Sequence, residues 1–203
     1  SVEILDQQGL QAFLLQAGVT PEAAVEIDLP EPGGNTRRFK VWQTPIMEAR
    51  LQNRYPEIRT YTAFALDNPH VTAKIDFTSK GFHAQVFDGE YSFLIDPYSR
   101  DADGYYLVYF KKDYHRNLGK RMVCELDEEA RNALQPGGLP EDISGGGGMP
   151  DMELKQHGSV RKTYRLALSC TGEYAAAVDG PNPTTAGVLS AMTTTMNRVN
   201  GIY

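Results

Sequence analysis

Five short apolar segments between residues 58 and 110 constrain the fold more than any other feature of this chain. They span residues 58–66, 71–77, 82–87, 91–95 and 105–110, with Gly, Pro, Asn and Asp concentrated between them. Asp88-Gly89 is typical of a two-residue hairpin turn. Short strands at intervals of about ten residues, joined by tight turns, predict an antiparallel meander rolled into a barrel-like sheet or a sandwich.

The residues before this region predict short helices and one more hairpin. Apolar spacing over residues 3–17 predicts a helix ended by Gly18, and residues 45–55 predict a second helix closed by Pro56. Residues 21–29 and the strand containing Phe39 flank a Pro- and Gly-rich turn, which is a hairpin pattern. The first part of the chain is therefore expected to be α+β and mostly antiparallel.

A composition shift marks a domain boundary after residue 134. Residues 135–150 contain six Gly and three Pro, including four consecutive Gly at 145–148. Such a segment buries too little apolar surface to offset its chain entropy. We expect a folded domain over residues 1–134, a linker over 135–161 and the start of a second domain over 162–203.

The last forty residues predict a strand, a loop and a helix. The strand is expected over residues 164–170 and the Gly-Pro-Asn-Pro loop over 180–183. Asn182 or Thr184 can cap the helix after this loop. An apolar stripe on that helix, expected to be its core-facing side, contains the residues Val188, Met192, Thr195, Val199 and Tyr203, widened by Met196. A helix that continues to the last residue suggests a domain whose remainder lies elsewhere.

Composition restricts the partners of the chain. With 203 residues, a net charge of −6 and a pI of about 5.2, it is a poor candidate for nucleic-acid binding. No apolar run approaches the roughly 18 residues that span a membrane, and no signal peptide is visible. The two cysteines, Cys124 and Cys170, are too few to indicate a redox compartment, and Cys170 is expected in the core.

Two blocks near the end of the chain carry a family resemblance. YRLAL with TGEY at residues 164–174, and then TMNRVNGIY at residues 195–203, resemble the start of the catalytic domain of bacterial reprolysin-like (adamalysin-type) zinc metallopeptidases, especially those that Bacteroidetes secrete. Upstream, GFHAQVF, FLIDPYS and YYLVYFKKDY resemble the prosegments of the same proteins. The resemblance implies a secreted zymogen whose signal peptide has been removed, with an inhibitory and folding prosegment before a metzincin-type α/β catalytic domain.

The zinc motif of that family is absent from these residues. The motif H-E-x-x-H-x-x-G-x-x-H places two His one helical turn apart with a Glu base between them. Here the four His are at positions 70, 83, 115 and 157, and none is followed by Glu. The resemblance therefore implies zinc and the catalytic residues in a downstream part of the parent peptidase, whose partners are the rest of its own catalytic domain and protein substrates.

The candidate site residues lie near the predicted boundary. Cys124 could supply a thiolate to the open zinc position and keep the peptidase latent, as a prosegment cysteine can in animal relatives, although MVCEL does not match their motif. A small apolar core role for Cys124 remains open. The basic pair Arg161-Lys162 marks the processing region. A calcium loop at residues 101–104 lacks the remaining ligand spacing. The resemblance does not favour calcium either, because Arg165 lies near the place where the animal relatives carry an acidic calcium ligand.

A second interpretation stays open, in which the chain is a non-catalytic β-rich module that binds carbohydrate or protein. The unfinished helix and the Gly-rich linker favour the zymogen. On that hypothesis residues 1–134 fold alone, whereas residues 163–203 are unstable without further polypeptide or a partner.

Overall fold

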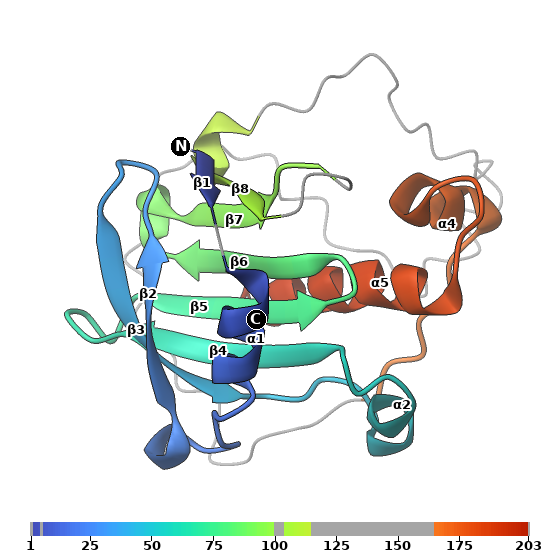
Figure 1. The fold of residues 1–203 in the computed structure, drawn as a ribbon, viewed down its shortest axis with the longest axis horizontal. Coiled ribbons are helices and arrows are strands. Elements are labelled where there is room, and N and C mark those ends of the chain that lie inside the picture. The colour runs from blue at the N-terminus through green and yellow to red at the C-terminus, as the bar shows by residue number, and fades with distance from the viewer. Residues whose placement is uncertain (1, 5, 100–103, 115–164, 203) are drawn as a thin grey trace, which may run out of the picture. The chain divides into compact units, whose positions relative to one another are not determined.

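The segments predicted as strands form one curled antiparallel sheet (Figure 1). The structure is a computed structural model and describes residues 2–4, 6–99, 104–114 and 165–202. The seven strands from β2 to β8 neighbour one another in chain order, and β1 (Val2–Ile4) adds to the edge at β8. The other strands are β2 (Val25–Pro30), β3 (Thr36–Gln43), β4 (Arg59–Ala65), β5 (Thr72–Thr78), β6 (Gly81–Phe87), β7 (Phe93–Pro97) and β8 (Tyr105–Phe110). The expected meander is confirmed, and it curls into half a barrel.

Turn chemistry differs from the prediction at one hairpin. The tight turn lies between β5 and β6, where Thr78 pairs with Gly81 and Gly81 has a φ of 100°. That φ favours Gly. Asp88-Gly89 is not a two-residue hairpin, because the 3₁₀ helix η2 (Gly89–Tyr91) lengthens this connection. The predicted hairpin of β2 and β3 is confirmed, with Pro30 opposite Thr36.

The inner face of the sheet carries the hydrophobic core. Side chains alternate between the two faces of a strand, so Phe39, Ile75 and Val86 point inward and are fully buried. Helix α1 (Gln7–Leu14), capped by Asp6, covers this face with Leu14. It is shorter than the predicted helix over residues 3–17, because Val2–Ile4 pair with β8 instead. Among the described residues, this core draws no side chain from 165–202.

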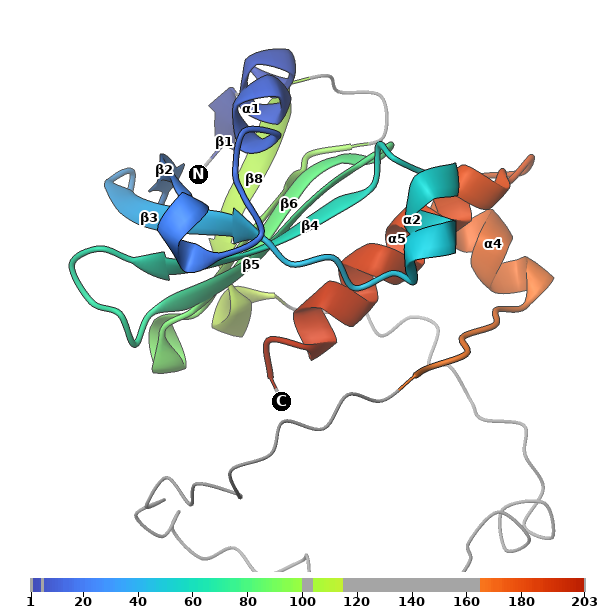
Figure 2. The same ribbon diagram turned by 90° about the horizontal axis from the view of Figure 1, so that it is seen from below.

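The outer face of the sheet is polar and is covered by a helix. Figure 2 shows α1 on one side of the sheet and α5 on the other. Asp76 and Thr60, a cross-strand pair on β5 and β4, are buried on the outer face, and His83 pairs with Asp76 from β6. Helix α2 (Ala49–Arg54) connects β3 to β4 and replaces the longer helix predicted over residues 45–55.

The C-terminal region contains two helices where the sequence predicted a strand and one helix. Helix α4 (Gly172–Asp179) starts at the N-cap Thr171, and helix α5 (Thr185–Val199) starts at Thr184, one of the two predicted caps. Gly180 joins them with a φ of 88°. The strand predicted over 164–170 is wrong for its described part, since residues 165–170 are exposed and in no strand or helix. Those residues pair with no strand of the described part of the chain. Their β propensity alone does not form a strand, because a strand is stabilised by packing against its cross-strand neighbours.

The face that α5 buries is the opposite of the predicted one. Its buried residues recur at helical spacing and are small or polar: Gly187, Ser190, Thr193, Thr194 and Asn197. The predicted stripe lies on the other side of the helix, where Thr195 is exposed and Val188, Met192 and Val199 are only half-buried. The stripe therefore does not pack on this sheet, because the sheet face that α5 covers is polar.

The described residues before position 115 and those from position 170 onward belong to one compact unit. The predicted boundaries at 134 and 161 fall outside the described residues, so the division into domains stays a prediction.

One arginine links three connections at the same end of the sheet. Arg37 contacts Glu31 at 3.2 Å, Asp67 at 3.4 Å and Asp88 at 2.9 Å. The hydrogen bond to Asp88 is the main reason that the pKa of the Arg37 guanidinium is raised, with Glu31 and Asp67 adding to it. Its side chain is 24% exposed, so solvent screens these pairs less than it screens an ordinary surface pair.

We expect Arg37→Ala to lower the free energy of unfolding by about 1–2 kcal/mol, because three carboxylates lose their shared partner. The matched control is Arg38→Ala. Arg38 is 59% exposed and pairs with Asp28 at the surface, so its loss should cost clearly less than the loss of Arg37. Urea unfolding of both variants tests this expectation, and equal costs would show that the three-way contact adds nothing.

Candidate functional site

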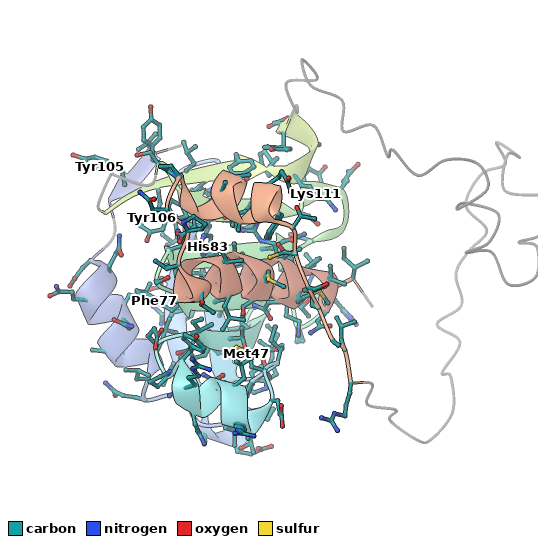
Figure 3. All side chains as sticks on the ribbon, turned by 90° about the vertical axis from the view of Figure 1, so that its right-hand side faces the viewer. Met47, Phe77, His83, Tyr105, Tyr106 and Lys111 are labelled. Atoms are coloured by element: carbon teal, nitrogen blue, oxygen red, sulfur yellow. The ribbon has the colours of Figure 1, made fainter. Side chains whose placement is uncertain are left out.

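A cleft of about 580 Å³ lies between the strand ends of the outer face and the two C-terminal helices. The β5–β6 turn and β7 form one wall, and α4 and α5 form the other. Figure 3 shows His83 in the space between α4 and α5. The polar side chains that line the cleft are Ser79, Lys80, His83, Asp96, Thr194 and Arg198, among others.

Asp76 is the centre of the polar contacts. Its carboxylate is 1% exposed and lies in β5, between Ile75 and Phe77, whose side chains point to the opposite face of the sheet. One oxygen, Oδ1, accepts a hydrogen bond from Thr194 Oγ1 at 2.7 Å and lies 3.1 Å from His83 Nδ1. A carboxylate buried this deeply is costly unless donors surround it. The hydroxyl from α5 therefore stabilises a group that the sheet cannot satisfy with its backbone.

A second carboxylate, Asp96 on β7, joins α5 to the sheet in the same way. Its Oδ1 pairs with Arg198 of α5, and its Oδ2 accepts a hydrogen bond from the Tyr109 hydroxyl at 2.8 Å. Burial raises the pKa of Tyr109, and the charge of Asp96 and this hydrogen bond raise it further. The phenol therefore stays protonated and acts as a donor at neutral pH.

A third carboxylate fixes the corner between the two helices. Asp179, the last residue of α4, pairs with Lys80 of the β5–β6 turn. Its Oδ2 also accepts hydrogen bonds from the backbone N–H of Thr184 at 2.7 Å and from the Thr184 hydroxyl at 2.9 Å. These contacts hold the start of α5 against the sheet, where Ser190 and Ser79 share a hydrogen bond of 2.9 Å.

The C-terminal end of α5 and the residues just after it contact the backbone of β5 and the Phe87 ring of β6. Asn197 Nδ2 donates to the carbonyl of Ile75 at 2.9 Å, while its Oδ1 is buried without a partner in the described structure. Gly201 lies so close to the Phe87 ring and to Lys74 that a Cβ there would overlap them. Helix α5 thus lies along β5 from the Ser79 turn to Phe87.

This arrangement can bind a helix, but it does not form a zinc centre. Within the described residues, no three His, Cys, Asp or Glu side chains are grouped as metal ligands. His83 Nδ1 lies 3.1 Å from Asp76 Oδ1, and His70 is exposed in the turn before β5. The zinc that the family resemblance implies does not fit this part of the chain.

Most of the candidate site residues from the sequence lie elsewhere. Cys124 and the processing pair Arg161-Lys162 are outside the described residues, as are residues 101–103 of the rejected calcium loop. Cys170 is exposed with a free thiol, so its expected place in the core is wrong.

Glu173 lies in the first turn of α4. Hydrogen bonds from its own backbone N–H and from Thr171 lower its pKa.

Sequence reasoning missed the residues that join α5 to the sheet. A single acidic residue inside the apolar segment 71–77 was a usable indication, since Asp is depleted in strands and buried Asp needs a partner. Nothing in the sequence pointed to Thr194 as that partner, because it is one of three consecutive threonines.

No protein-family model, no curated protein and no solved structure matched this chain. None of the described helices is long and apolar enough to cross a bilayer.

Proposed function

We propose that residues 1–134 are the prosegment of a secreted reprolysin-like zinc metalloendopeptidase and that residues 162–203 begin its catalytic domain. The prosegment assists folding of the peptidase and keeps it latent. The sequence basis is the order of the two motif blocks, YRLAL–TGEY and TMNRVNGIY, near the end of the chain. The parent enzyme hydrolyses peptide bonds with zinc-activated water, and the residues for that chemistry lie outside this chain.

One observation carries the proposal. The hydrophobic core of the sheet contains no residue from 165–202, and the sheet nevertheless holds α5 through specific hydrogen bonds and the ion pair of Arg198 with Asp96. A prosegment that assists folding has to be stable by itself and has to hold a segment of the enzyme in place. The self-contained core of the sheet and its contacts with α5 support these two requirements.

The apolar stripe of α5 supports the same proposal. Val188, Met192 and Val199 lie on the side of the helix away from the sheet and are half-buried. A helix with one polar face bound and one apolar face turned outward can be held by the prosegment while its apolar face packs into a second domain.

The gene itself provides the first test. We expect an H-E-x-x-H-x-x-G-x-x-H motif within about 150 codons after Tyr203, the length of a typical domain. The full-length protein should then cleave peptides after processing near Arg161-Lys162 and lose this activity when a chelator removes zinc. A peptidase domain expressed without residues 1–134 should misfold and recover activity when the prosegment is supplied separately.

A continuation without that motif, or cleavage that chelators do not affect, would contradict the proposal. The binding-module hypothesis would then take its place, since Tyr91, Tyr98, Tyr105 and Tyr114 are exposed aromatic side chains on or beside β7 and β8. Exposed Tyr rings are common contacts for carbohydrate and protein partners.

A further inference from the structure

We infer that the outer face of the sheet is a docking site for a helix with a small polar face, and that α5 can leave this site while the sheet stays folded. This inference deepens the proposed function, since it describes how the prosegment and the start of the peptidase would separate. Its partner is specific: the C-terminal segment of this chain that contains α4 and α5.

The first argument is the chemistry of the contact. The described contacts that join α5 to the sheet are between polar groups. They include Thr194 with Asp76, Ser190 with Ser79, Asn197 with the Ile75 carbonyl and Arg198 with Asp96. Hydrogen bonds contribute little net free energy, because the same groups bond to water when separated. These hydrogen bonds instead determine which helix sequence can dock on the outer face of the sheet.

The second argument is shape. Gly201, just after the end of α5, lies so close to the Phe87 ring of β6 that a Cβ on it would overlap the ring. Apart from Gly187, the buried positions of α5 carry hydroxyl or amide side chains of small size. An ordinary amphipathic helix with Leu or Met on its buried face would clash with this surface and leave Asp76 without its hydroxyl donor.

The third argument is that the contact is incompletely packed. The cleft of about 580 Å³ borders the helix along Ala191, Thr194 and Arg198. Asn197 Oδ1 and Arg198 Nε are buried without a hydrogen-bond partner in the described structure, which costs free energy in the docked state. Regions with few apolar contacts open locally at a free energy below that of global unfolding.

Native-state hydrogen exchange of the whole chain tests the inference. The amides of α5 should exchange by local opening, with protection at least about tenfold below that of the amides of β4 to β6. Thr194→Val removes the donor to Asp76 and should accelerate exchange in α5 by roughly a further tenfold, without changing β4 to β6.

Two matched variants serve as controls. Thr195→Val makes the same chemical change one residue later, where the side chain is exposed and its hydroxyl donates to the carbonyl of Ala191 within the helix. Val199→Thr places a hydroxyl on the outward stripe. Neither variant should change the exchange of α5 by more than about twofold.

Two results would overturn the inference. Equal protection of α5 and the central strands would mean that the helix leaves only when the sheet unfolds. Acceleration by Val199→Thr or Thr195→Val as large as that by Thr194→Val would mean that the polar face does not determine docking. The hydrogen exchange of α5 and the sheet does not depend on any polypeptide beyond Tyr203. The absence of a zinc motif there would therefore contradict the proposed function without contradicting the inference about α5 docking.

Discussion

Replacing Phe39 with alanine is expected to lower the free energy of unfolding by about 3–5 kcal/mol. Phe39 is fully buried on the inner face of β3, where it belongs to the core under α1. The substitution removes a buried aromatic ring, and with it the free energy gained by burying that ring. It also leaves a cavity that the curled sheet cannot close completely. A cost of this size is a large part of the roughly 5–15 kcal/mol that stabilises a typical domain.

The matched control is Phe13→Ala, because Phe13 is 40% exposed on α1 and should cost less than about 1 kcal/mol. Urea unfolding followed by circular dichroism gives both values. If Phe39→Ala leaves no folded protein, Phe39→Leu provides a smaller loss that can still be measured. Similar costs for the buried and the exposed phenylalanine would contradict the assignment of the core.

The second large effect is expected at alkaline pH. Burial raises the pKa of Tyr61 from 10.0 to about 12, and nearby Arg59 opposes the shift only in part. The phenolate is therefore more favourable in the unfolded chain than in the folded one. The contribution of this group to stability is complete below pH 10 and is lost as the pH rises from 10 to about 12.

A shift of this size corresponds to about 2–3 kcal/mol. Tyr61→Phe removes the titrating group and keeps the ring that packs in the core. The variant should therefore lose about 2–3 kcal/mol less than the parent between those two pH values, with little difference at neutral pH. Urea midpoints across the alkaline range measure this difference, and parallel losses in the two proteins would show that Tyr61 does not ionise in the unfolding reaction.

These two predictions concern the sheet, whereas the proposed function concerns the helix that the sheet holds. Loss of the Phe39 ring should make the sheet and the docked α5 less stable together, because the outer face exists only when the strands are paired. Loss of the Thr194 hydroxyl should weaken the docking of α5 alone. Comparing the two variants separates the stability of the sheet from the strength with which it binds α5. The proposed zymogen depends on both properties.

The sequence by itself determined the β meander. Alternating apolar residues and turn-forming residues at regular intervals fit a pleated strand, because successive side chains point to opposite faces and tight turns need particular backbone angles. The strands from Arg59 to Phe110 therefore begin and end close to their predicted positions. The Thr184 cap was predictable for the same local reason. The expected continuation of the helix to the last residue was wrong, because α5 ends at Val199 with Asn200 as its C-cap.

Only the tertiary structure decided where α5 docks and which face it uses. Periodicity shows that Val188, Met192 and Val199 share one side of the helix. It carries no information about the surface against which the helix packs. That surface holds the buried carboxylate of Asp76, and a buried charge requires donors more strongly than a half-buried apolar stripe requires contact. The polar face of α5 consequently lies against the sheet, through a pairing of residues 118 positions apart in the chain.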